Sequence, residues 1–242
     1  MTTDFTYEDY LDILSPQESG EEFWRSEKVY KLYLTKYETC KRFNPEKIAE
    51  IGVRNGYSAY AFLKACPKAS YYGFDLSTGK RVAGGVKGIN TYPYVSSMLL
   101  RKIPAVDFYL FHADTQASMS LTDQIYNERN GIKGFYHNSV KPVMDWLPTD
   151  LINFDFFHVD GGHTVINCFH DMTIAMFAIK MGGVILVDDQ QNVRVRKAID
   201  DFVHYFQFLI KKIEIKKGEH TIIWRNDQVY EPKIPWNNDD ST

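Results

Sequence analysis

The sequence is poor in cysteine and has neither a long apolar run nor an excess of positive charge. Its three cysteines, Cys40, Cys66 and Cys168, form no CxxC pair and have no spacing typical of a zinc site. No apolar segment approaches the length of a membrane span, and acidic residues interrupt Met1–Leu14, which excludes a secretory h-region. A formal net charge of −3 argues against a nucleic-acid-wrapping surface. These absences predict a soluble, cytoplasmic protein with reduced thiols.

Strand and helix patterns alternate along most of the chain. Apolar strands are predicted at Lys47–Val53, Ser70–Asp75, Phe154–Val159 and Val184–Val187, and helical stretches lie between them. One of these helices is predicted from Thr164 to Met181, with Gly182-Gly183 stopping it. Such alternation is typical of βαβ units and a parallel sheet, so the fold class is α/β. Near the end, residues 208–225 read as an antiparallel hairpin.

Three regions surround or interrupt this alternation. Residues 1–44 are expected to form a helical extension, which could pack on the sheet edge, cover an active site or make the contact of a homo-oligomer. Residues 45–226 form the main domain, and residues 227–242 form a tail. Within 76–140, partly irregular or inserted, helices are expected at 95–102 and 121–129. Strands are expected at 106–111 and 134–137, one of which is the third strand of the core.

The first constellation with chemical meaning is the segment Glu50–Ser58 at a strand-to-helix junction. Glycine there lets a ligand approach the backbone, and the helix start offers N–H groups to an anion. The glycines do not follow GxGxxG, which makes a nicotinamide dehydrogenase a poor match. Asp75 ends the next strand, where a carboxylate can accept both hydroxyls of a ribose. Together they predict an adenosine ligand with an anionic end, such as S-adenosylmethionine; a plain turn and a helix cap are the alternative.

The second constellation consists of Asp160-Gly161-Gly162-His163 and Asp188-Asp189, which close two further strands. Carboxylates converging without cysteine favour a hard cation such as Mg²⁺, which would lower the pKa of an acceptor hydroxyl. His163, three residues after Asp160, could take the hydroxyl proton. The alternative is that these side chains cap helices or bind turn amides.

Taken in order, these motifs resemble those of class I S-adenosylmethionine-dependent methyltransferases, and within them the macrocin O-methyltransferase group. The resemblance spans about residues 46–205 and is most specific over 155–189. It implies a Rossmann-like, seven-stranded, mostly parallel sheet with helices on both faces. It also implies a metal-dependent enzyme acting on a hydroxyl of a sugar or other small molecule, with Asp160, Asp188 and Asp189 as metal ligands. Asp160 and His163 are the predicted catalytic residues. The residues expected to contact the cofactor are Glu50, Gly52, Asn55, Gly56, Tyr57, Ser58, Asp75, Leu76, Asn138, Ser139 and Asp160.

Two departures from the family pattern leave alternatives open. Many relatives have Asp-Gly-Asp-His where this chain has Gly162, and the missing aspartate has been proposed as the general base. A cofactor-binding protein without activity is therefore an alternative, and a nucleic-acid methyltransferase is a third that the net charge does not favour. The residues near the adenine are either Asn138-Ser139 or the segment around Asp114.

Overall fold

The structure is a computed structural model that describes residues 4–16, 18–75, 91–103, 105–114, 120–127, 132–137, 153–216 and 220–227. Of residues 112–114, 120–127 and 132–137 it describes the backbone alone. The strands are β1 (Lys47–Ile51), β2 (Ser70–Asp75), β3 (Asp107–Asp114), β4 (Ser120–Asn127), β5 (Ile132–His137), β6 (Phe154–Val159), β7 (Ile179–Asp188), β8 (Ile210–Lys216) and β9 (His220–Arg225). The helices are α1 (Tyr7–Asp12), α2 (Glu27–Phe43), α3 (Tyr57–Ala65), α4 (Tyr92–Lys102), α6 (Val165–Ala178) and α7 (Val193–Phe206).

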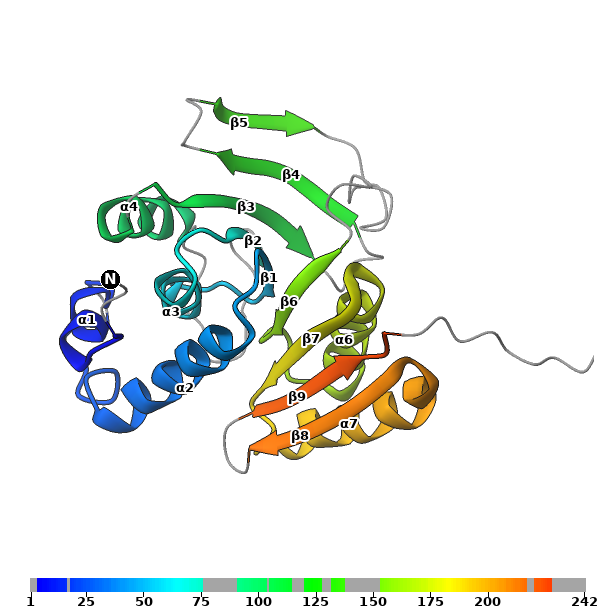
Figure 1. The fold of residues 1–242 in the computed structure, drawn as a ribbon. Coiled ribbons are helices and arrows are strands. Elements are labelled where there is room, and N and C mark those ends of the chain that lie inside the picture. Colours follow the sequence, from blue (N-terminus) through cyan, green and yellow to red (C-terminus); the bar gives the residue numbers. More distant parts are fainter. Residues whose placement is uncertain are drawn as a thin grey trace, which may run out of the picture.

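The described strands form one sheet in the order β5-β4-β3-β2-β1-β6-β7-β9-β8. From β3 to β7 the neighbours are parallel, and β9 runs antiparallel between β7 and β8. The predicted seven-stranded core with a C-terminal antiparallel hairpin is confirmed. Two antiparallel strands, β4 and β5, extend it beyond β3, at the top of Figure 1. The third core strand is therefore β3.

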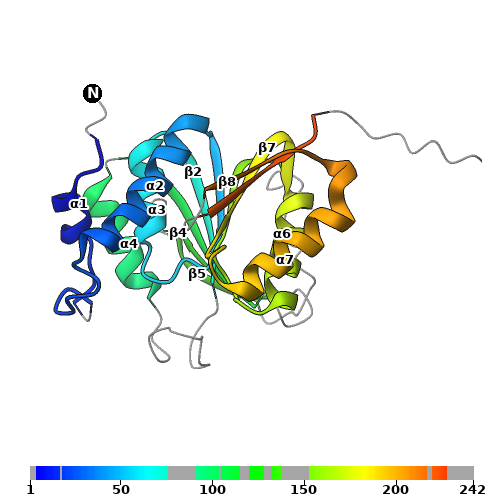
Figure 2. The same cartoon turned by 90° about the horizontal axis from the view of Figure 1, so that it is seen from below.

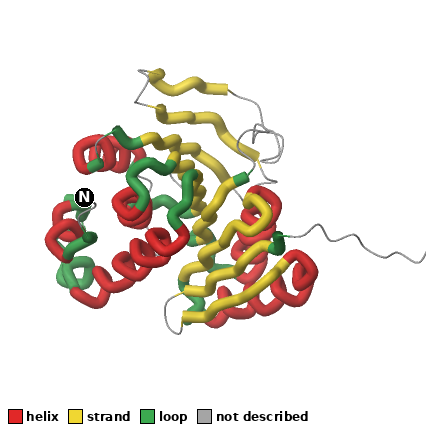
Figure 3. The backbone as a smooth tube through the Cα atoms, viewed as in Figure 1, coloured by secondary structure: helices red, strands yellow, loops and turns green. Residues whose placement is uncertain are grey.

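Helices cover both faces of the sheet, as Figures 2 and 3 show. Helices α1 to α4 lie on one face, and α6 and α7 lie on the other. Strand residues alternate between the two layers: in β1, Ile48 joins the core under α3, whereas Ala49 and Ile51 join the core under α6. Glu50 has the same parity as Ile48, and it is completely buried. A carboxylate is thereby placed inside the α3 layer.

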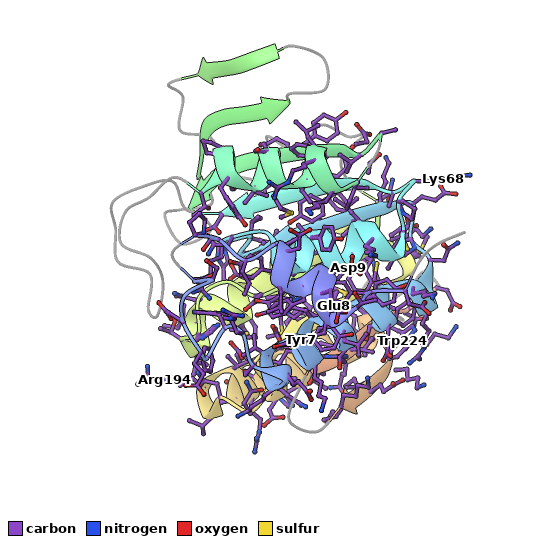
Figure 4. The ribbon with its side chains drawn as sticks, turned by 90° about the vertical axis from the view of Figure 1, so that its left-hand side faces the viewer. Tyr7, Glu8, Asp9, Lys68, Arg194 and Trp224 are labelled. Atoms are coloured by element: carbon purple, nitrogen blue, oxygen red, sulfur yellow. The ribbon has the colours of Figure 1, made fainter. Side chains whose placement is uncertain are left out.

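The amino-terminal helices pack on this layer. In Figure 4, Tyr7, Glu8 and Asp9 mark α1 at the front of the molecule, and the Asp9 carboxylate lies 2.6 Å from the Lys64 ammonium of α3. Helix α2 contacts α3 along its length, with Cys40 of α2 fully buried. None of the helices within the described ranges is both long and apolar enough to cross a bilayer.

Two predicted elements were wrong. Residues 121–127, expected to be helical, belong to strand β4, because pairing with β3 (Phe111 opposite Ile125) overrides a weak local preference. The helix expected to continue to Met181 ends at Ala178, and Ile179 already pairs with Phe154 at the start of β7. Gly182 and Gly183 lie inside that strand and do not stop the helix.

Candidate active site

The loop between β1 and α3 is tightly wound. Gly52, Arg54 and Gly56 have φ values of +94°, +47° and +75°. A Cβ atom on Gly52 would lie 2.0 Å from the backbone oxygen of Asp160. The Gly52 amide also donates to the Phe74 carbonyl at 2.8 Å, so the loop is held between the ends of β2 and β6. The sequence predicts that glycine lets a ligand approach this backbone closely. In the structure, the group that lies close to Gly52 is the protein's own backbone at Asp160.

Glu50 and Ser58, predicted to contact the cofactor, bond to each other beneath this loop. The Glu50 carboxylate accepts from the hydroxyls of Ser58 and Tyr71, and lies 2.8 Å from Nδ1 of His158. All four side chains are buried. The His158 Nε2 atom is buried as well, and among the described residues it has no hydrogen-bond partner. The network forms the floor of the loop, and direct cofactor contact by Glu50 or Ser58 stays a prediction.

Asp75 closes β2 beside the loop and is half-buried. Its Oδ2 accepts a hydrogen bond from the Arg54 backbone amide, so the predicted ribose ligand is tied to the predicted cofactor loop. The backbone of Asp114 ends β3, the next strand. Leu76, Asn138 and Ser139 lie outside the described residues, so the choice between Asp114 and Asn138-Ser139 stays open.

A glutamate of the amino-terminal segment enters the same loop. Glu18 is buried and accepts hydrogen bonds from the Arg54 guanidinium (2.5 Å), the Asn55 amide (2.8 Å) and the Tyr57 hydroxyl (2.5 Å). The Arg54 guanidinium also lies 4.3 Å from the centre of the Trp24 ring. Asn55 and Tyr57, both predicted cofactor residues, are therefore oriented by the amino-terminal segment. Sequence analysis missed Glu18, because nothing near it in the chain signals this contact.

The acidic residues gather at the ends of β6 and β7, as predicted, but in two groups. Asp160 belongs to both: one group adds His158 and Asp188, and the other adds His163 and Asp189, with ligand atoms within 4.8 Å of one another in each. His163 Nε2 lies 3.0 Å from Asp189 Oδ2 and 3.8 Å from Asp160 Oδ1. The consecutive residues Asp188 and Asp189 thus serve different partners.

A lysine from α2 completes the first group. Lys36 Nζ lies 2.5 Å from Asp188 Oδ2 and 3.3 Å from Asp160 Oδ2, and the residue is only 4% exposed. Its ammonium is also 5.2 Å from the centre of the Tyr33 ring. Sequence analysis missed Lys36, although a signal exists: seven residues after Val29 and four before Cys40, it lies on the buried stripe of its helix. A lysine at such a position requires a partner.

These charges perturb one another. Burial opposes the charged ammonium, but Asp188 and Asp160 outweigh it and raise the pKa of Lys36 well above its ordinary value. Burial also acts against the Asp188 carboxylate, yet Lys36 holds its pKa far below the usual range. Burial and the neighbouring Asp188 and Asp160 raise the pKa of Asp189. The carboxylates of Asp160 and Asp189 outweigh burial and raise the pKa of His163. The site therefore contains paired charges of both signs.

The predicted Mg²⁺ ligands do not fit a divalent ion as a set. Carboxylate oxygens are the right donors, and they would have to lie about 2.0–2.6 Å from the ion. The Lys36 ammonium already contacts Asp160 and Asp188, and Asp189 is paired with His163 instead. A divalent ion bound by both Asp160 and Asp188 would compete with the ammonium for their carboxylate oxygens.

Gly162, where relatives have an aspartate, is explained by its neighbour. A Cβ atom there would lie 2.6 Å from Nδ2 and 2.8 Å from Cβ of Asn167, in the first turn of α6. The backbone N–H of Asn167 donates to the Thr164 hydroxyl at 3.2 Å. The turn is closed by Asn167, so a side chain at position 162 would require α6 to shift.

Comparisons with known proteins bear on the family and the fold. Residues 49–190 match the model of a family described as a methyltransferase domain. The fold is similar to that of the SAH-bound methyltransferase PaMTH1 of Podospora anserina (16% identity, 91% of this chain and 86% of that chain covered, TM-score 0.51). It also resembles the O-methyltransferase TomG of Streptomyces achromogenes, involved in tomaymycin synthesis and solved with SAM (14% identity, 81% and 80% covered, TM-score 0.49). No curated protein matches the sequence.

Proposed function

Because the chain belongs to the methyltransferase-domain family, and is thereby an S-adenosylmethionine-dependent methyltransferase of class I, we propose that it methylates a hydroxyl group of a small molecule or sugar. The family match covers residues 49–190, which include the loop after β1, Asp75 and the acidic residues after β6 and β7. The proposal concerns the acceptor and the residues that act on it.

The observation that carries the proposal is the contact between Gly52 and Asp160. A Cβ atom on Gly52 would lie 2.0 Å from the backbone oxygen of Asp160. The expected cofactor loop and the acidic centre are therefore direct neighbours. Ligands of open α/β sheets bind at the carboxyl ends of the strands, where both lie. A methyl donor in the loop and a hydroxyl at the acidic centre would then be close enough for in-line transfer.

His163 is the residue best placed to accept the hydroxyl proton. His163 Nε2 lies 3.0 Å from Asp189 Oδ2, and a neutral imidazole with its proton on Nε2 carries its lone pair on Nδ1. The acceptor oxygen would attack the sulfonium methyl carbon, the carbon–sulfur bond would break, and the proton would pass to His163. Asp189 would orient the ring and stabilise the imidazolium that forms.

The metal ion, the location and the assembly predicted from the sequence take no part in the proposed reaction. Because Lys36 contacts Asp160 and Asp188, no step of the proposed reaction uses the Mg²⁺ expected at Asp160, Asp188 and Asp189. Direct cofactor contacts by the predicted residues, a cytoplasmic location and homo-oligomer formation stay predictions.

The second candidate is a cofactor-binding protein without catalytic activity. It is considered because Gly162 stands where many relatives have the aspartate proposed as the general base. The pairing of His163 with Asp189 favours the enzyme, because a base and its orienting carboxylate are both present. The two are separated by titrating the protein with S-adenosylhomocysteine, with NADH as control, and then assaying labelled methyl transfer to a panel of hydroxyl compounds. Binding with transfer supports the enzyme, and binding without transfer to any hydroxyl supports the second candidate. A folded sample that binds no S-adenosylhomocysteine refutes both.

A further inference from the structure

Lys36 occupies a place in the acidic centre that the reaction proposed above does not explain. Its side chain enters from α2, outside the segment that matches the methyltransferase family. Lys36 and Asp160 are 124 residues apart in sequence, yet the ammonium lies 3.3 Å from Asp160 Oδ2 and 2.5 Å from Asp188 Oδ2. A buried lysine is costly unless paired, so this contact with two carboxylates is what makes its burial tolerable.

The surroundings of the ammonium are those of a cation site. Asp160, Asp188 and His158 have ligand atoms within 4.8 Å of one another, and the buried His158 Nε2 has no hydrogen-bond partner among the described residues. Two carboxylates and an imidazole could coordinate a divalent ion such as Mn²⁺. The cation in contact with both carboxylates is instead the protein's own ammonium.

Helix α2 holds this ammonium in place. One turn after Lys36, the Thr39 hydroxyl lies 3.3 Å from Nε2 of His220 in β9, and the Cys40 thiol contacts the Phe62 carbonyl of α3 at 3.7 Å. Thr39, Cys40 and His220 are all buried. Because the helix is fixed on both sides, Lys36 cannot withdraw by a movement of α2 without disrupting buried contacts.

We propose that the Lys36 ammonium takes the place of a divalent metal ion in this active site, so that methyl transfer needs no bound metal. Lys36 is a positioning residue: it neutralises Asp160 and Asp188 and fixes their carboxylates beside the acceptor site. The transfer part of this inference rests on the proposed function. The replacement of the ion does not, since it can be measured by metal binding alone.

The test is Mn²⁺ binding, followed by the loss of the free-ion signal in electron paramagnetic resonance. The wild-type protein should bind no Mn²⁺ that depends on Asp188. Lys36→Met removes the ammonium and should bind one ion per chain at Mn²⁺ concentrations at least about tenfold below any at which wild type binds, because uncompensated carboxylates attract a hard cation. Asp188→Asn added to Lys36→Met should abolish that binding. Lys36→Arg, which retains the charge, should bind like wild type.

Lys31→Met is the matched control, because Lys31 lies on the same helix but is exposed and, within the described part of the chain, pairs with Glu27 alone, at 3.5 Å. It should leave Mn²⁺ binding unchanged. The inference is overturned if wild type binds one Mn²⁺ per chain through Asp188, or if folded Lys36→Met gains no binding. Should Lys36→Met fail to fold, the wild-type and Lys36→Arg titrations still decide. Absence of methyl transfer with these metal results would refute the proposed function and leave this inference intact.

Discussion

The substitution Gly52→Ala tests the contact that joins the cofactor loop to the acidic centre. Two separate costs are expected. At φ +94° an alanine is strained by about 1–2 kcal/mol. Its Cβ would also lie 2.0 Å from the oxygen and 2.5 Å from the carbon of the Asp160 carbonyl, and 3.1 Å from the Gly161 nitrogen. Because these are all backbone atoms, no rotamer change relieves the clash, and we expect about 1–3 kcal/mol more.

Gly182→Ala is the control that isolates the second cost. Gly182 also has a positive φ, +77°, but the nearest atom to its Cβ would be the Asp227 Cβ at 3.8 Å, an ordinary contact. The two variants therefore share the backbone strain and differ in the clash. Urea denaturation should give a free energy of unfolding about 1–3 kcal/mol lower for Gly52→Ala than for Gly182→Ala.

Affinity for S-adenosylhomocysteine should follow the same order. Relief of the clash must move the loop away from Asp160, so Gly52→Ala should weaken binding, whereas Gly182→Ala, far along β7, should not. Equal unfolding free energies for the two variants would refute the reasoning, because the close approach would then cost nothing. Unchanged affinity for S-adenosylhomocysteine in a destabilised Gly52→Ala protein would show that this loop does not bind the cofactor.

Four further results are expected. Asp75→Ala should weaken S-adenosylhomocysteine binding about 10- to 100-fold, since a charge-assisted hydrogen bond contributes about 1.5–3 kcal/mol; equal affinity in a titration would remove Asp75 from the site. His163→Gln should lower kcat about 100-fold or more without changing that affinity, and an unaffected turnover would mean that another group is the base. Gly162→Asp should lower the thermal midpoint by displacing Asn167, and an unchanged or higher midpoint would contradict this. Burial lowers the pKa of His220 from 6.5 to about 4. The unfolded chain therefore takes up this proton first, and up to about 3 kcal/mol of stability is lost as pH falls from 6.5 to 4. His220→Gln should flatten that pH dependence of the unfolding free energy.

The sheet core and the polar ends of its strands could be predicted because both depend on local pattern. Apolar strands such as Phe154–Val159 are followed directly by a polar residue, here Asp160, and parallel strands bring those ends to one edge. Strand β4 could not be predicted in this way, since its polar sequence becomes a strand by pairing with β3. The hydrophobic pattern of the sequence therefore indicates which polar residues lie at the carboxyl edge of the sheet, whereas strands such as β4 depend on pairing with a neighbouring strand.

Glu18 and Lys36 were not predicted as site residues from the sequence. Both lie in the amino-terminal helical segment and make long-range contacts. Each is a buried, charged residue whose hydrogen-bond partners lie 36 or more residues away in the sequence. No local period identifies such a partner for Glu18. For Lys36 the helix period indicates burial, and burial of an ammonium requires carboxylates. The amino-acid pattern thus predicts an acidic partner for α2, although it does not identify Asp160 and Asp188 as that partner.

The division of the acidic residues follows from the same principle. Asp160, Asp188 and Asp189 were predicted as one set of metal ligands because all three lie at the ends of core strands. Consecutive residues at a strand end, however, do not share a direction, and Asp189, with φ +54°, turns out of the strand geometry that Asp188 still follows. Asp188 therefore meets Lys36, and Asp189 meets His163. One carboxylate is neutralised by a fixed ammonium while its neighbour orients an imidazole, so two adjacent aspartates can support charge balance and proton transfer separately.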